Sequence, residues 1–518
     1  MPIRMEQDPQ QDRNQGNNDP RRRRSGGGML GQLLPFLLMF LFKRPKLLIP
    51  ILIIGGLWYF FSGSFDAGPA PANDSADISN FFFGAALNED LYDKAEVFEP
   101  LASVGSFNGL PTAVSLEQYA PRRLHQGRQG SCVGWASAYS ARTILHSRAT
   151  AQNPNQVAFS PSYLYNQIAL QGCQGAYMLD AMKAMSSYGS LPFNEFGYDE
   201  RSCSKEPTSN QLRVGQQYRI KGYNRLTLGG TNYTPDMVAI KQNLAQGAPV
   251  VIGMQVGGSF MSRMLGQDIW IPTRSDYSMR GFSGHAMTVI GYDDNKRGGA
   301  FQIMNSWGED WGNRGIAWVR YPDFEHFVKE AYGLYPMGSA EEYDPNKLSV
   351  EFGLYKPDAN ATLSLSKEGD RTFRTIAPVR IGDKFKILVA NSIECYIYVF
   401  GEETDGSSYV LFPYTEKHSP YCGIVGTRLF PKDYSMVADD LGNRDRIAVV
   451  VSKKELNFSQ LNAAINASSA STYAGKLDQA LGNEQIQNVQ FKTGQTVAFE
   501  ADASSRNIVG MIIEIDKR

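Results

Sequence analysis

The spacing of apolar residues changes character partway along this 518-residue chain. Between residues 133 and 247 several segments have apolar residues at helical spacing, and glycines end two of these segments, so the sequence predicts helices. From residue 249 short apolar runs alternate with turn residues, which predicts strands. Helices followed by strands indicate an α+β domain with a helical half and an antiparallel sheet half. The predicted helices cover 133–149, 159–170, 176–189 and 235–247, and the predicted strands cover 249–256, 284–294, 300–308 and 315–322.

A second change follows near residue 345. Short β-rich runs separated by turn residues continue to the end of the chain and are interrupted by one helical stretch, residues 459–482. This pattern predicts a separate, mainly antiparallel domain over residues 345–518. Its partner is not indicated by the sequence, and a binding or scaffolding role is the simplest expectation.

The beginning of the chain has a different composition. Residues 1–28 are rich in Gln, Asn, Arg and Gly and contain RRRR, so we expect them to be disordered. Residues 29–63 are strongly apolar apart from KRPK at 43–46, and we predict one transmembrane helix over about 47–63. Residues 64–108 form a linker and a lead-in to the first domain, which we place at 109–340.

The positive charges near the apolar run all lie on its N-terminal side. The positive-inside rule therefore predicts a cytoplasmic N-terminus and a catalytic domain outside the cytoplasm, most simply in a bacterial periplasm. A cleaved signal peptide is the alternative, because Ala70 and Ala72 form an A-x-A arrangement. The long basic region before the apolar run favours a retained membrane anchor.

Charge and motif content exclude two other classes. The net charge of −1 and the pI near 6.6 give no field that would attract nucleic acid, and we expect no nucleic-acid partner. The chain contains no HExxH or CxxC spacing. We therefore expect neither a metal nor another cofactor.

The five cysteines are an odd number. Cys173 and Cys203 lie in one region and Cys395 and Cys422 in another, so they are candidates for two disulfides. Five reduced thiols are the alternative. Pairing within regions leaves Cys132 alone.

Cys132 lies where a glycine-rich loop enters a helix. The unpaired N–H groups and partial positive charge of a helix N-terminus stabilise a thiolate, which is the nucleophilic form. His285 begins a predicted strand and is a candidate base, and Asn305, at the end of the next strand, could orient it. A hairpin would bring these two side by side, with Trp307 shielding their hydrogen bond. Each residue taken alone could be structural.

Attack of the thiolate on a carbonyl would produce an oxyanion, which needs hydrogen-bond donors to stabilise it. The backbone N–H of Cys132 is one, and the side-chain amide of Gln126 is the second.

Together these motifs resemble the papain-like cysteine peptidases. The resemblance rests on QGRQGSC before a helix, GCQG, GHAMTVIGYDD and NSWGEDWGNRGIAWV, in family order over roughly residues 109–335. It implies a two-lobed papain-like fold, Cys132 as nucleophile, His285 as base and acid, and Asn305 as orienter. It also implies Gln126 in the oxyanion hole, Trp307 as the aromatic shield, and Gly175 and Gly284 as substrate-binding residues.

The chain departs from the family pattern at several positions. Val133 follows the nucleophile where the family usually has tryptophan, and Trp135 stands two residues later. Gln129 occupies the position of a usual disulfide cysteine whose partner matches Cys173, which leaves Cys173 free to pair with Cys203. The lead-in contains no clear inhibitory helix, so control by a pro-segment stays open. The second domain resembles a bacterial accessory domain of unknown function.

We therefore expect a membrane-anchored cysteine endopeptidase that acts on peptides or proteins through a thioester intermediate. Two alternatives remain open. One is a catalytically inactive, peptidase-like binding protein, and the other is an acyl transferase or amidase acting on cell-wall peptides.

Overall fold

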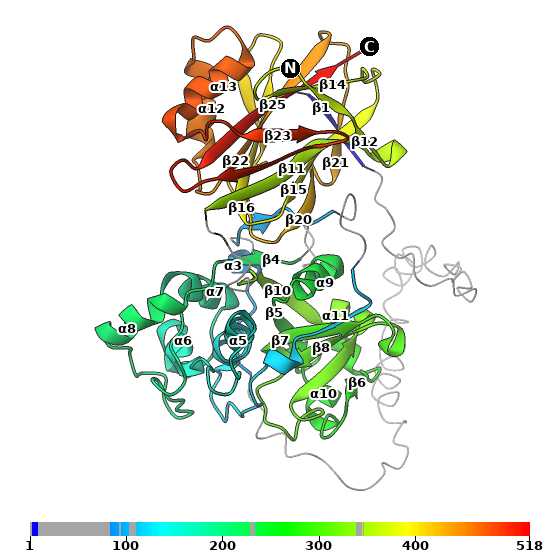
Figure 1. Ribbon diagram of the computed structural model, residues 1–518. Coiled ribbons are helices and arrows are strands. Elements are labelled where there is room, and N and C mark those ends of the chain that lie inside the picture. Colours follow the sequence, from blue (N-terminus) through cyan, green and yellow to red (C-terminus); the bar gives the residue numbers. More distant parts are fainter. Residues whose placement is uncertain are drawn as a thin grey trace, which may run out of the picture. The chain divides into compact units, whose positions relative to one another are not determined.

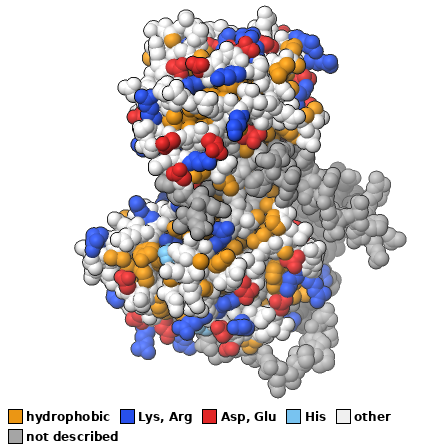
Figure 2. Space-filling model, viewed as in Figure 1, with side chains coloured by type: hydrophobic (Ala, Val, Ile, Leu, Met, Phe, Trp, Pro, Cys, Tyr) orange, Lys and Arg blue, Asp and Glu red, His pale blue; other side chains and the backbone are white. Residues whose placement is uncertain are grey.

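The computed structural model describes residues 3–8, 83–92, 95–102, 110–227, 234–337, 344 and 346–518. Residues 1–8 and 76–518 belong to one compact unit, which contains an α+β domain and a β-rich domain (Figure 1). The predicted membrane span over 47–63 lies outside the described residues. Among the helices that the structure describes, none is both long enough and apolar enough to cross a membrane. Acidic and basic side chains are interspersed on the face shown in Figure 2.

One long helical rod forms the centre of the helical half. It begins at Cys132 and runs without a break through α4 (Cys132–Gly134), a π-helical stretch (Trp135–Arg142) and α5 (Thr143–Thr150). The side chain of Ser160 accepts a hydrogen bond from the Tyr163 amide and so begins the next helix, which lies within the predicted range 159–170. The remaining helices of this half are α6 (Pro161–Ile168), α7 (Met178–Ser187) and α8 (Ser209–Gly215).

The other half is a mainly antiparallel sheet, so the α+β prediction is confirmed. In spatial order its strands are β4 (Tyr223–Arg225), β10 (Val328–Leu334), β5 (Val250–Val256), β7 (Ser283–Asp293), β8 (Ala300–Met304), β9 (Ile316–Arg320) and β6 (Ile269–Trp270), with β3 (Ala113–Ser115) paired to β7. The short helices α9 (Met237–Ala245), α10 (Gly258–Ser262) and α11 (Tyr321–Phe327) also belong to this half.

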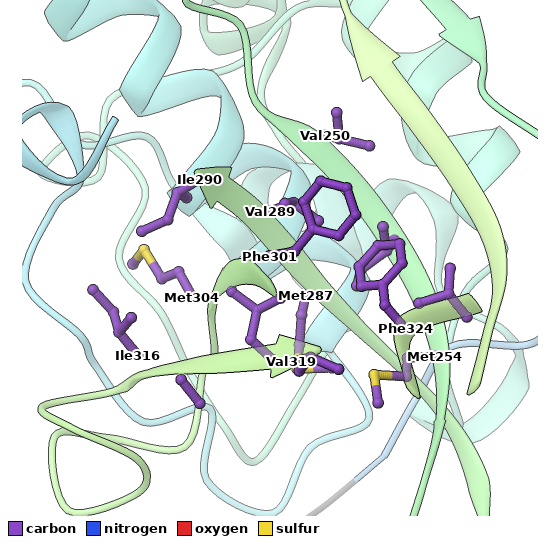
Figure 3. Packing of buried hydrophobic residues seen from close by; sticks show 14 of the residues in the cluster. Val250, Met254, Met287, Val289, Ile290, Phe301, Met304, Ile316, Val319 and Phe324 are labelled. Carbon is purple, nitrogen blue, oxygen red and sulfur yellow. The ribbon is translucent and has the colours of Figure 1, made fainter. Parts of the chain in front are cut away.

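The sheet half is held together by buried apolar side chains. Val250 and Met254 of β5, Val289 of β7, Phe301 of β8 and Phe324 of α11 belong to one cluster (Figure 3). Each fully buried side chain of this size contributes about 1.5–3 kcal/mol to stability. This core makes β7 a rigid, central support for His285.

The C-terminal domain is a sandwich of two sheets, in agreement with the predicted mainly antiparallel domain. One sheet has the order β1 (Arg4–Gln7), β21 (Tyr434–Val437), β15 (Lys384–Asn391), β11 (Lys347–Lys356), β24 (Val497–Asp502) and β23 (Gln490–Thr493), with β12 (Ala361–Leu363) and β20 (Gly426–Phe430) paired to it. The other has the order β13 (Leu365–Lys367), β14 (Thr372–Thr375), β25 (Ile508–Asp516), β22 (Arg444–Ser452), β16 (Cys395–Glu402) and β17 (Ser408–Phe412), with β19 (Tyr421–Cys422) paired to β16. Apolar side chains from both sheets form one core.

The predicted helical stretch 459–482 is two helices. These are α12 (Phe458–Ala467) and α13 (Tyr473–Leu481), which pack their apolar faces against the second sheet. The serine-rich residues 468–472 between them favour turns over a continuous helix.

The N-terminal residues require a correction. Residues 1–28 are predicted to be disordered, but Arg4–Gln7 form β1, which pairs antiparallel with β21. Ile3 is buried in the core of the C-terminal domain, and Asp8 forms an ion pair with the buried Lys386 at 2.5 Å. The apolar contact and the neutralised lysine explain why this short segment is ordered, although its composition is polar.

The candidate disulfide between Cys395 and Cys422 is not formed, because both residues are free thiols in the structure. They lie directly opposite each other on β16 and β19. The Ile397 amide donates to the Pro420 carbonyl, so the alternation of the ladder makes Cys395 and Cys422 a hydrogen-bonded pair. The Cβ atoms of such pairs lie farther apart than the ~3.5–4.5 Å that a disulfide requires.

Candidate active site

Cys132 is the first residue of the helical rod and is completely buried. The amide of Ala286 donates a hydrogen bond to its Sγ atom at 3.4 Å. Ala286 follows His285 on β7, so the sulfur lies beside the strand that carries the candidate base. The helix of one half and the sheet of the other therefore meet at this thiol.

His285 and Asn305 are joined across the hairpin formed by β7 and β8. Nε2 of His285 and Oδ1 of Asn305 are 2.7 Å apart, and Oδ1 also accepts the amide of Ser306 at 2.8 Å. An amide oxygen only accepts, so Nε2 carries the proton and Nδ1 of the neutral ring is unprotonated. Nδ1 has no hydrogen-bond partner among the described residues. This nitrogen is therefore the one that can take a proton from the thiol.

Trp307 covers the pair formed by His285 and Asn305. Its ring stacks on the imidazole with centroids 4.4 Å apart, and its side chain is almost fully buried. Exclusion of water strengthens the hydrogen bond beneath it. Asn305 itself is also almost fully buried.

Gln126 is held from two sides. Its Oε1 accepts the hydroxyl of Ser306 at 2.7 Å, and its Nε2 donates to the carbonyl of Gln129 at 2.9 Å. The Gln126 amide also donates to the Ser306 carbonyl. Ser306 adjoins Asn305, so the loop before the helical rod is fastened to the strand end that carries the orienting amide.

Burial determines the protonation of the two reactive groups. Desolvation raises the pKa of Cys132 to about 12, although backbone N–H groups partly offset it. Desolvation also lowers the pKa of His285 to about 4, against the opposing effect of Asn305. In this state the pair is a neutral thiol and a neutral imidazole near pH 7.

Part of the lead-in lies against the two reactive residues. Residues 83–88, called here the covering segment, lie between Ala176 on one side and Gly284 on the other. The amide of Ala176 donates to the Gly84 carbonyl at 2.9 Å and the amide of Ala86 donates to the Ala176 carbonyl at 3.1 Å. On the other side, the Ala85 amide donates to the Gly284 carbonyl at 3.1 Å. The ring of Phe83 lies 6.4 Å from the His285 ring.

Glycines on both sides permit this close approach of backbones. A Cβ atom on Gly175 would lie 2.6 Å from the Gly84 carbonyl oxygen, and one on Gly284 would lie 2.2 Å from the Ala85 oxygen. A Cβ atom on Gly84 would lie 2.0 Å from the Gly130 oxygen. Gly175 and Gly284 are predicted from the resemblance as substrate-binding residues. They border the strip between Ala176 and Gly284 in which the covering segment lies.

Side chains hold the end of the covering segment. Leu87 fills the space above Gly253 beside Met178, where a Cβ atom on Gly253 would lie 2.6 Å from both side chains. The amide of Asn88 donates to the carboxyl of Glu330 at 3.3 Å, and burial raises the pKa of Glu330 to about 8. Leu87 is therefore packed beside Met178, with a buried carboxyl next to the end of the segment.

Most, but not all, of the residues at this site are predictable from the sequence. Cys132, His285, Asn305, Trp307 and Gln126 come together as described. The contacts of Ala176, Gly253, Met178 and Glu330 are not predictable, because they are main-chain hydrogen bonds and packing contacts that have no local motif. Ala176 is indicated only indirectly, because the resemblance implies a substrate-binding role for its neighbour Gly175.

Two further features bear on the site. Cys173 and Cys203 form a disulfide with a Cα–Cα distance of 5.9 Å, next to the strip that contacts the covering segment. Among the residues that the structure describes, no group of three or more His, Cys, Asp or Glu side chains could hold a metal ion.

Comparison with known proteins gives a consistent picture. Residues 117–330 match the family model described as papain family cysteine protease. The chain is 26% identical to an uncharacterized peptidase C1-like protein of Acanthamoeba polyphaga mimivirus, over 43% of this chain and 69% of that protein. It is 27% identical to cathepsin K of Mus musculus, over 37% of this chain and 54% of that protein. Among solved structures, the cysteine protease xylellain from Xylella fastidiosa is similar, with 24% identity, a TM-score of 0.36, and 52% of this chain and 95% of that chain covered.

Proposed function

We propose, from the premise that residues 117–330 are a papain-family cysteine peptidase domain, that this domain hydrolyses peptide bonds within polypeptide chains by the triad Cys132, His285 and Asn305. The observation that carries the proposal is the chain of contacts described above. The Cys132 sulfur accepts a hydrogen bond from the Ala286 amide, which follows His285 in the chain. His285 is hydrogen-bonded to Asn305 through Nε2, which leaves Nδ1 available to take the thiol proton.

In the first half of the reaction, Nδ1 of His285 takes the Cys132 proton and the sulfur attacks the substrate carbonyl. The oxyanion that forms is stabilised by the Cys132 backbone N–H and the Gln126 side-chain amide. His285 then gives the proton to the leaving amine, the C–N bond breaks, and a thioester remains.

In the second half, His285 removes a proton from water, and the resulting hydroxide attacks the thioester carbonyl. The C–S bond breaks, the carboxylic acid leaves, and the proton returns to the thiolate. Asn305 keeps the imidazole in one orientation and stabilises the imidazolium in both halves.

We further propose that the structure represents a latent form. The covering segment occupies the strip beside Cys132 and leaves the thiol with no exposed surface. Hydrolysis then requires this segment to leave, which also lowers the pKa of the thiol by returning water to the site.

The test is alkylation of Cys132 combined with peptide hydrolysis. In a chain whose lead-in has been cut and separated from the rest of the protein, an epoxysuccinyl probe should label Cys132, and Cys132→Ala should abolish both labelling and hydrolysis. Gln126→Ala should lower kcat by about 10²–10³-fold, because one oxyanion donor is lost. Gln156→Ala is the matched control, since Gln156 is an exposed glutamine of the same domain outside the site.

The same experiment separates the alternatives. A thiol no more reactive than a model thiol would indicate a peptidase-like binding protein and would overturn the proposal. Transfer of the acyl group to an added amine in preference to water, read by mass spectrometry, would indicate an acyl transferase.

For location, we propose a membrane-associated protein whose peptidase domain lies outside the cytoplasm. The apolar run at 47–63 supports association with a membrane. The disulfide between Cys173 and Cys203 supports an oxidising compartment such as a bacterial periplasm.

A further inference from the structure

We propose that the C-terminal domain retains the lead-in, so that docking of residues 95–102 on this domain keeps residues 83–88 over Cys132. Residues 95–102 are called the docking segment below. Contacts with both the C-terminal domain and the peptidase domain hold it in place. The inference rests on the proposed function only for its activity readout, because the contacts are independent of catalysis.

Main-chain hydrogen bonds align the docking segment on the C-terminal domain. β2 (Val97–Phe98) pairs in parallel with β18 (His418–Ser419), and the Val97 amide donates to the Lys417 carbonyl at 2.9 Å. Five residues later, the Ala102 amide donates to the Thr427 carbonyl at 2.7 Å. The segment is thus held near both ends.

A buried arginine holds the middle of the docking segment. Nε of Arg428 donates to the Glu99 carbonyl at 2.9 Å, while its other nitrogens donate to Asn391 Oδ1 and to the Ile424 carbonyl. The Arg428 side chain is almost fully buried, so loss of the Glu99 carbonyl would leave a guanidinium donor without an acceptor in a dry site. This arrangement makes the lead-in part of the hydrogen-bonded interior of the C-terminal domain.

Apolar contacts extend the docking to the peptidase domain. Leu101 is buried with Tyr335 and Ile424, and the ring of Phe98 lies 5.7 Å from that of Tyr335. Tyr335 follows β10 of the peptidase domain, whereas Ile424 precedes β20. The docking segment therefore lies where the two domains meet, and Gln242 of the peptidase domain also donates to the Leu101 carbonyl.

The end of the covering segment is held by the residues that follow it. Helix α3 (Glu89–Tyr92) comes directly after this segment, and the hydroxyl of Tyr92 contacts the backbone of Ala331 on β10 at 3.3 Å. Arg225 lies over the Tyr92 ring at 4.3 Å and donates to the Tyr92 carbonyl. Movement of the docking segment is therefore expected to be transmitted to the covering segment.

This arrangement has a consequence for activation. A cut between Ala102 and Leu110 separates the lead-in from the peptidase domain along the chain. The C-terminal domain remains covalently joined to the peptidase domain after Tyr335, and it still binds the docking segment. The cut lead-in therefore stays near the site at high effective concentration, and one cut does not expose Cys132.

The experiment compares cut and uncut full-length chains. A recognition site for a sequence-specific protease is placed between residues 102 and 110, with and without Ala102→Pro, which removes the hydrogen bond to Thr427. Alkylation of Cys132 is followed by mass spectrometry. We expect the cut parent chain to react as slowly as the uncut chain, and the cut Ala102→Pro chain to react at least about tenfold faster.

Control variants test whether faster alkylation of Cys132 results from loss of docking. Ile376→Pro removes one main-chain hydrogen bond, to Ser364, elsewhere in the C-terminal domain and should react like the parent chain. Phe98→Ala is the second docking variant, used if Ala102→Pro fails to fold. Amide exchange of residues 84–86 gives a readout that does not depend on catalysis, and it should accelerate only in the cut docking variants.

The proposal is overturned if the cut parent chain already reacts as fast as the cut docking variant. It is also overturned if both stay slow while exchange shows that the docking segment has been released. A chain that exposes Cys132 as proposed but hydrolyses no peptide would instead contradict the proposed function alone.

Discussion

Burial controls the state of the two reactive residues. Cys132 and His285 are fully buried, and desolvation moves their pKa values in opposite directions, to about 12 and about 4. Both shifts favour the neutral forms, so the thiolate–imidazolium pair needed for attack is disfavoured while the covering segment is in place. The proposed latent form is thus inactive for two reasons. The covering segment blocks access to Cys132, and burial disfavours the charged pair.

This difference predicts the pH dependence of alkylation. In the intact chain, the iodoacetamide rate at Cys132 should rise continuously between pH 7 and pH 10, because the thiolate fraction rises up to a pKa of about 12. Without the lead-in the site is solvated, so the thiol pKa falls, and the helix N-terminus and a protonated His285 stabilise the thiolate further. The rate should then level off at a lower pH than in the intact chain. Peptide mapping measures both profiles, with the buried thiols Cys395 and Cys422 as internal references. A plateau near neutral pH in the intact chain would contradict the prediction.

A single glycine tests whether the covering segment produces the burial. Gly84→Ala introduces a Cβ atom 2.0 Å from the Gly130 oxygen, so the covering segment and the loop at Gly130 can no longer lie in their present contact. We expect the alkylation rate of Cys132 at pH 7 to rise at least about tenfold. Gly197→Ala is the matched control, because no atom lies within 4 Å of the added Cβ there. An unchanged rate in Gly84→Ala would show that the segment does not limit access.

Secondary-structure elements were predictable where one segment carries its own pattern. The strands β7 and β8 follow from apolar runs and turns, and their hairpin brings His285 to Asn305. The start of the helix at Cys132 follows from the glycine-rich loop before an apolar periodic run. These signals are local, so a single sequence contains them.

Other elements could not be predicted, because their order depends on distant partners. The covering segment contains Gly84, Ala85 and Ala86, and binds largely through main-chain groups, which leave no side-chain pattern. Similarly, β1 is stabilised by Lys386, almost four hundred residues away. Cys395 and Cys422 stay reduced because they form a hydrogen-bonded pair between β16 and β19. The sequence does not reveal this, because it does not give the register of the two strands.

The disulfide gives a prediction for the loops of the helical half. The bond between Cys173 and Cys203 joins residues thirty positions apart. Its removal in the double variant Cys173→Ala/Cys203→Ala should lower the free energy of unfolding by about 2–4 kcal/mol, mainly because the unfolded chain gains freedom. Denaturant unfolding of the parent and the variant measures the difference. A reductant should destabilise the parent but not the variant, and equal sensitivity of both would contradict the assignment.

For the whole molecule, the C-terminal domain organises segments from distant parts of the chain. It pairs β1 with β21 and binds the docking segment through β18 and Arg428. It also contacts the peptidase domain directly, where Gln246 exchanges two hydrogen bonds with the backbone of Val425. This domain thus has a structural reason to accompany the peptidase, beyond added stability.

The pairing of β1 has a consequence for membrane topology. Asp8 cannot form its ion pair with Lys386 unless the N-terminus and the C-terminal domain lie on the same side of any membrane. We therefore expect epitope tags placed before residue 1 and after Arg518 to share one response when a protease is added outside sealed vesicles carrying the full-length chain. Both tags should be cut, or both should be protected, and detergent should expose both.

Asp8→Asn serves as the matched variant in this experiment. It removes the counter-charge of Lys386 and so weakens the pairing of β1 without altering the charges that flank the apolar run. The parent chain should show the shared response regardless of vesicle orientation. A parent chain with only one tag protected would show that β1 does not pair with β21 in the membrane. The single crossing with a cytoplasmic N-terminus, expected from the positive charges before residue 47, would then be the correct topology.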